Sequence, residues 1–191
     1  MNGVDILTMQ LLGSCNLVAT QAEEVAPFWD QRAFAKASLP GFVEWHCARI
    51  IDWGVHTVVR NVPELASQPR WRDRVRYEMG HGVGISDAEA DDIAVTVAAS
   101  DVAEYAHALR DGIASWLDAT EPSELDQVPD LRARSQDHLR YRSPSAWEEI
   151  KSLEGIPAWQ FLARPCIAHI RVHSGQVDLL TQLLRSRQLP S

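Results

Sequence analysis

The stretch Cys166-Ile-Ala-His169-Ile-Arg-Val-His173-Ser-Gly-Gln176-Val-Asp-Leu-Leu180 places apolar residues and histidines at helical spacing. His169 and His173 are four residues apart, so on a helix they lie on adjacent turns, about 40° apart around the axis. Their imidazoles can then converge on one point, as a metal ion requires. An alternative is a pair that faces solvent without a ligand. The two histidines lie in the polar middle of a helical stripe whose other members are mostly apolar and are therefore expected to face the core. The stripe comprises Leu162, Cys166, His169, His173, Gln176, Leu180 and Leu183.

A second helical seam carries a third histidine, His46, among apolar residues that include Ile50 and Trp53. A buried imidazole without a partner costs roughly 1–3 kcal/mol, and one cation bound by all three histidines would satisfy them together. Three neutral imidazoles with an open coordination position are typical of catalytic zinc sites, although nickel and iron also accept imidazole. The hypothesis is one divalent metal ion, zinc, nickel or iron, held by His46, His169 and His173.

Apolar residues recur every three or four positions along the chain, and strand-like alternation is nearly absent. This pattern predicts an all-α protein with one domain over residues 1–191, a four-helix bundle with short extra helices in the connections. Capping boxes at Ser86-Asp-Ala-Glu89 and Ser145-Ala-Trp-Glu148 predict two short helices. Pro165 predicts either a kink or a fresh start inside the last helix. The long helices are expected over 4–25, 40–61, 101–119 and 158–186, and a connection without long helices over 121–143.

Composition excludes several classes of function. Lys and Arg total 18 against 26 Asp and Glu, so the net charge is −8 at pH 7 and charge-driven nucleic-acid binding is not expected. Cys15, Cys47 and Cys166 are far apart and form no C-x-x-C pair, which favours a reducing compartment over a disulfide scaffold. The most apolar stretch, 6–19, is too short and too polar to span a bilayer. We therefore expect a cytoplasmic protein without a membrane or nucleic-acid partner.

Three segments together resemble one bacterial family. The stretch 166–180 resembles the H-x-x-x-H-x-G-Q signature that closes the DinB-like (YfiT-like) superfamily of metal-binding proteins. The segment 42–53, with His46 and a Trp about two turns later, is similar to that family's second helix. The segment from Tyr105 to Trp116-Leu-Asp-Ala-Thr is similar to its third helix. The resemblance covers nearly the whole chain and is looser over 67–95 and 121–157.

The resemblance implies a four-helix bundle that holds one divalent metal through His46, His169 and His173. Characterised relatives include enzymes that use the low-molecular-weight thiols mycothiol or bacillithiol in S-transfer or isomerisation, and metal-dependent hydrolases. Homodimers are frequent in the family. The implied function is a metal-dependent transferase, isomerase or hydrolase that acts on a small-molecule substrate, with the metal activating a thiol or water. The alternative is a metal- or ligand-binding bundle without catalysis.

Other polar residues near the histidines have two interpretations each. Arg49 either contacts an anionic substrate or is a surface ion-pair partner. Gln176 either orients a ligand imidazole or substrate, or is a polar residue at a helix contact. Cys47 and Cys166 are redox-active groups, extra ligands or small buried apolar residues. His81, in the glycine-rich segment Gly80-His-Gly82-Val-Gly84, either reaches a substrate or has no chemical role.

Overall fold

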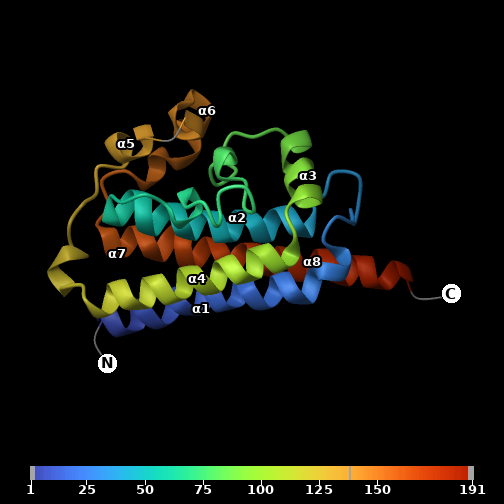
Figure 1. Cartoon of the computed structure of the whole chain (residues 1–191), viewed down its shortest axis with the longest axis horizontal. Helices are drawn as coiled ribbons and strands as arrows, with labels where there is room; N and C mark the ends of the chain where they lie inside the picture. Colours follow the sequence, from blue (N-terminus) through green and yellow to red (C-terminus); the bar gives the residue numbers. More distant parts are fainter. Residues whose placement is uncertain (1–2, 138, 189–191) are drawn as a thin grey trace.

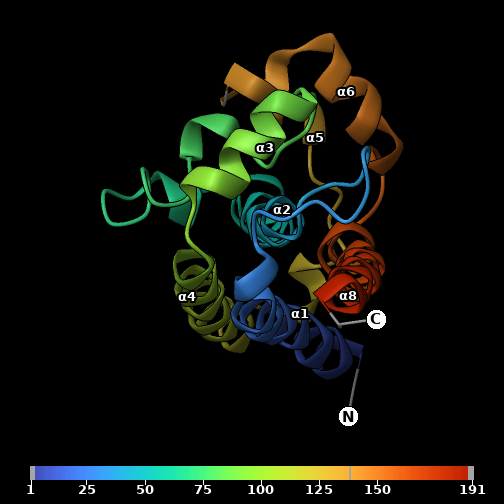
Figure 2. The same cartoon turned by 90° about the vertical axis from the view of Figure 1, so that its right-hand side faces the viewer.

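A computed structural model describes residues 3–137 and 139–188, and those residues form helices and loops without a strand (Figure 1). The long segments are α1 (Gly3–Val25), α2 (Pro40–Asp52), α4 (Ala99–Asp118) and α7 with α8 (Ala158–Phe161 and His169–Gln188). They lie side by side as a helical bundle, which confirms the prediction of an all-α chain (Figure 2). Across α2, away from α1, lie the short helices α3 (Asp87–Thr96), α5 (Leu131–Arg134) and α6 (Pro144–Ile150).

The helix that carries His46 is longer than α2 alone. Pro40 occupies its first turn, where the missing backbone N–H is not needed. From Trp53 to Arg60 the helix continues with wider, π-type turns. It ends where Asn61 adopts a left-handed conformation, with φ of 53°. The predicted helix over 40–61 is therefore confirmed.

The helix that carries His169 and His173 passes through Pro165 without breaking. Proline removes one backbone donor and collides with the preceding turn of a regular α-helix. Here the turns from Leu162 to Ala168 widen into a π-helical segment, which joins α7 to α8. The widened turns are one of the recognised ways in which a helix accommodates such a residue.

The short helices test the capping predictions. Ser86 caps α3 through a capping box with Glu89, as predicted. The prediction of a cap at Ser145 is wrong, because α6 begins at Pro144 and its cap is Ser143, whose Oγ accepts from the Ala146 N–H at 3.1 Å. Proline favours the first helical position, which moves the cap one residue before it. Within the described residues, no helix is both long and apolar enough to cross a lipid bilayer.

Candidate metal centre

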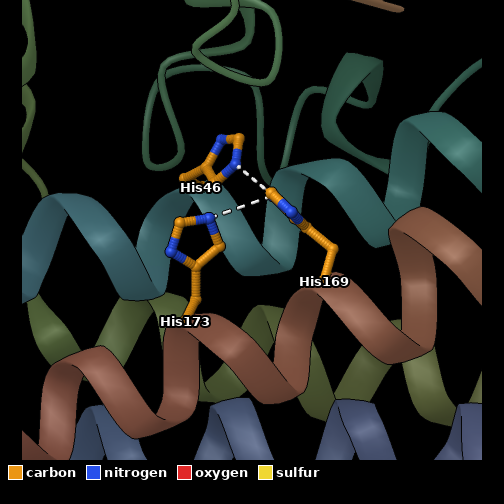
Figure 3. A group of neighbouring side chains, drawn as sticks. All are labelled: His46, His169 and His173. Carbon is orange, nitrogen blue, oxygen red and sulfur yellow. Dashed lines mark hydrogen bonds between the residues drawn. The ribbon is translucent and has the colours of Figure 1, made fainter. Parts of the chain in front are cut away.

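Three imidazole rings from two helices meet at one point between α2 and α8 (Figure 3). The Nε2 atom of His169 lies 3.1 Å from Nε2 of His46 and 3.0 Å from Nε2 of His173. Each ring offers one nitrogen atom as a ligand, and these three nitrogens all lie within 4.8 Å of one another. Two imidazole nitrogens on one tetrahedral zinc ion lie about 3.3 Å apart, given zinc–nitrogen bonds of about 2.0–2.1 Å. The spacing therefore fits a cation held by all three rings.

The other nitrogen of two of these rings is held by an oxygen acceptor. His46 Nδ1 donates to the main-chain oxygen of His81 at 2.5 Å. His173 Nδ1 donates to Oε1 of Gln176 at 2.8 Å. Because the proton of each neutral ring is then on Nδ1, the lone pair on Nε2 faces the common point. Metal-binding histidines in proteins are oriented by such hydrogen bonds.

The environment keeps two of the rings, those of His46 and His169, in the neutral form that binds metals. Burial, and then the electrostatic effect of the neighbouring His173, lowers the pKa of His46 to about 3. The same two causes lower the pKa of His169 to about 4. At neutral pH both rings are therefore unprotonated, and protons do not compete with a cation for their nitrogens.

A glycine-rich loop brings the His81 carbonyl to His46. Gly80 and Gly82 have φ of +63° and +92°, values that favour glycine. A Cβ at Gly82 would lie 3.0 Å from the Trp45 ring and 3.4 Å from His46 Nδ1. At Gly82 the loop therefore approaches the helix that carries His46 more closely than a residue with a side chain would easily allow. The glycines are evident in the sequence, but nothing in the sequence indicates that the main chain beside them orients His46.

A cavity of about 330 Å³ lies beside the histidines. His46 and His169 form part of its wall, so the point on which the rings converge is next to space for a small molecule. The remaining lining is mostly apolar, with three exposed polar or charged side chains at the rim. It consists of Ile50, Trp53, His81, Val83, Glu149, Ile150, Ser152, Leu153, Arg164 and Pro165.

Of the two residues predicted to contact substrate, Gln176 lies at the site and orients His173. Arg49 is completely buried and does not line the cavity. Its guanidinium donates to Asp52 Oδ2 at 3.0 Å, to Glu64 Oε2 at 2.6 Å and to the Gly80 carbonyl at 3.0 Å. These partners give Arg49 a structural role, in place of the predicted contact with an anionic substrate or of a surface ion pair.

The cysteines and the His81 ring lie apart from the ligand set. Cys47 and Cys166 are buried, and burial raises the pKa of both thiols well above the usual value, so they are protonated at neutral pH. They behave as small buried apolar residues. The His81 ring is buried between Trp53 and Tyr141, with centroid distances of 4.5 and 5.0 Å, and the residue contributes to the wall of the cavity.

Comparison of the chain with family models, with curated proteins and with solved structures finds no match.

The hydrogen bond from His173 to Gln176 makes a testable contribution to metal binding. Replacing Gln176 with leucine removes the acceptor but retains the size of the side chain, so the His173 ring loses its fixed orientation. We expect the affinity for zinc to fall about 10- to 100-fold, as for other losses of a hydrogen bond to a metal ligand. Competition with a chromophoric chelator measures the affinity. Gln182→Leu, on the exposed face of the same helix, is the control; equal affinities of the two variants would contradict this role.

Proposed function

We propose that this chain is a metal-dependent enzyme of the DinB-like type, which acts on a small molecule by thiol transfer, isomerisation or hydrolysis. The observation that carries the proposal is the convergence of three imidazoles from two helices beside a cavity whose wall includes His46 and His169. The resemblance in sequence supports it, because the three histidines stand where that family's signature has its ligands. The arrangement of the four long helical segments is compatible with the same family.

The chemistry would begin with the three histidines. A divalent ion held by His46, His169 and His173 would lower the pKa of a bound thiol or water and so supply a nucleophile at neutral pH. Three protein ligands leave a coordination position for that group, which distinguishes catalytic from structural zinc sites. The neighbouring cavity gives an electrophile a place to lie within reach.

The chain's own residues would prepare the site. The main-chain oxygen of His81 and the Gln176 side chain fix two of the ligand rings before any substrate arrives. Apolar side chains such as Ile50, Val83 and Pro165 exclude water from much of the cavity. Both effects raise the reactivity of a nucleophile that develops charge, because the surroundings need not reorganise during the reaction.

The experiment compares zinc-loaded protein with metal-free protein and with the zinc-treated His173→Ala variant. Each is mixed with a small thiol and monobromobimane, an electrophile that becomes fluorescent on S-alkylation, and in parallel with a small activated ester. We expect a rate that requires zinc and is lost in His173→Ala. His107→Ala, which alters an exposed histidine on α4, should retain the rate. Bound zinc without any rate above the metal-free protein would favour the non-catalytic binding bundle.

A further inference from the structure

The rim of the cavity beside the histidines carries one arginine. Arg164 lies on the π-helical segment Leu162–Ala168, five residues before His169 on the same continuous helix. Five residues correspond to about 7–8 Å along a helix axis. Arg164 therefore lines the same cavity as His46 and His169, at a different position along the helix from His169.

The guanidinium of Arg164 has N–H donors that remain available for a ligand. Its NH1 donates to the main-chain oxygen of Ser152 at 3.2 Å. In the part of the chain that the structure describes, no carboxylate lies within ion-pair distance of it, whereas other arginines such as Arg74 and Arg76 are paired with acidic side chains. A guanidinium has five N–H donors in a planar fork that matches a carboxylate. Within the described residues, Arg164 therefore presents a guanidinium without a carboxylate partner at the rim of this cavity, in a chain with a net charge of −8.

A second donor lies in the wall. The Trp53 side chain lines the cavity and is completely buried, and its indole N–H has no acceptor among residues 3–137 and 139–188. A buried donor without an acceptor is destabilising, so this N–H is a weak point in the wall of the cavity. The acidic lining residue, Glu149, is already bound through Oε1 to the Gly84 N–H at 3.2 Å.

We propose that this cavity selects a small molecule that carries a carboxylate, with the carboxylate on Arg164 and a thiol or hydroxyl group directed at the three histidines. The apolar lining suits a short hydrocarbon segment between these two groups. This inference rests on the proposed function, because it takes the histidines as the metal-binding end of the same site. It makes Arg164 the residue that determines substrate specificity, in place of Arg49.

The test uses protein loaded with cobalt(II), whose near-ultraviolet absorption changes when a thiolate coordinates the ion. Titration with 3-mercaptopropionate, 2-mercaptoethanol and cysteamine compares a carboxylate, a hydroxyl and an ammonium group on similar short thiols. We expect 3-mercaptopropionate to bind about tenfold more tightly than 2-mercaptoethanol, and cysteamine to bind no more tightly than 2-mercaptoethanol. The difference should shrink as ionic strength rises, because the guanidinium is exposed.

Substitutions test whether Arg164 is the residue that causes the preference for a carboxylate. In Arg164→Gln the advantage of 3-mercaptopropionate should disappear while the affinity for 2-mercaptoethanol is unchanged. Arg171→Gln, which alters an exposed arginine on α8 that does not line the cavity, should retain the advantage. Equal binding of the three thiols, or a carboxylate preference that survives in Arg164→Gln, would overturn this inference alone. A spectrum that no thiol changes would instead contradict the proposed function.

Discussion

Replacing Arg49 with methionine is expected to lower the free energy of unfolding by about 3–5 kcal/mol, the usual result of removing one partner from a buried ion pair. The guanidinium and the Asp52 carboxylate are completely buried, and Glu64 is nearly so. Without Arg49, two carboxylates lose the positive charge that compensates them. Burial raises the pKa of Asp52, but bonds from His56 and the charge of Arg49 more than offset this, so the pKa is below its usual value and the group is ionised in the folded protein.

Urea denaturation measures this loss. Arg70→Met is the control, since the side chain of Arg70 is 68% exposed and its ion pair with Glu104 is long, at 3.9 Å; an exposed pair of this kind contributes at most about 1 kcal/mol. Equal urea concentrations at the midpoint of unfolding for Arg49→Met and Arg70→Met would contradict the structural role of Arg49. Because Arg49 also donates to the Gly80 carbonyl, next to His81, we expect the weakened loop to lower metal affinity as well.

Replacing His169 with alanine is expected to lower the affinity for zinc by more than about 100-fold, which exceeds the effect of losing a hydrogen bond to a ligand. Its Nε2 atom lies within 3.1 Å of both other Nε2 atoms, so it is the central member of the cluster. His46→Ala and His173→Ala should each have a similar effect. Isothermal titration calorimetry gives both the affinity and the number of ions bound.

The control for the histidine variants is His107→Ala, which removes an exposed imidazole on α4. It should bind zinc as the unaltered chain does. If His169→Ala retained the affinity of the control, the three converging rings would not be the binding site.

Much of the metal centre could be predicted from the sequence, because its geometry is mostly local. The four-residue spacing of His169 and His173 places both rings on one helical face whatever the rest of the chain does. His46 could be added because it interrupts an otherwise apolar seam. The ends of the long helices follow in the same way from periodicity and from proline, although α4 begins at Ala99 instead of residue 101, α8 ends at Gln188 instead of residue 186, and one cap moves from Ser145 to Ser143.

The surroundings of the centre could not be predicted, because they depend on contacts between distant parts of the chain. Arg49 lies one turn from His46, but its burial depends on Glu64 and on Tyr105, 15 and 56 residues further along the chain. The orientation of His46 depends on a main-chain oxygen 35 residues away. The role of Arg164 could not be predicted, because its cavity forms only where α2, the glycine-rich loop and the segment near Ser152 and Leu153 pack beside its helix.

The most direct test of the metal centre is elemental analysis of untagged protein purified without chelators, beside the His46→Ala/His169→Ala double variant. The structure predicts close to one equivalent of a divalent metal per chain in the unaltered protein, or after reconstitution with zinc, nickel or iron(II), and none in the double variant. A chain that stays without metal after all three reconstitutions would contradict the account, and so would equal metal content in the two proteins.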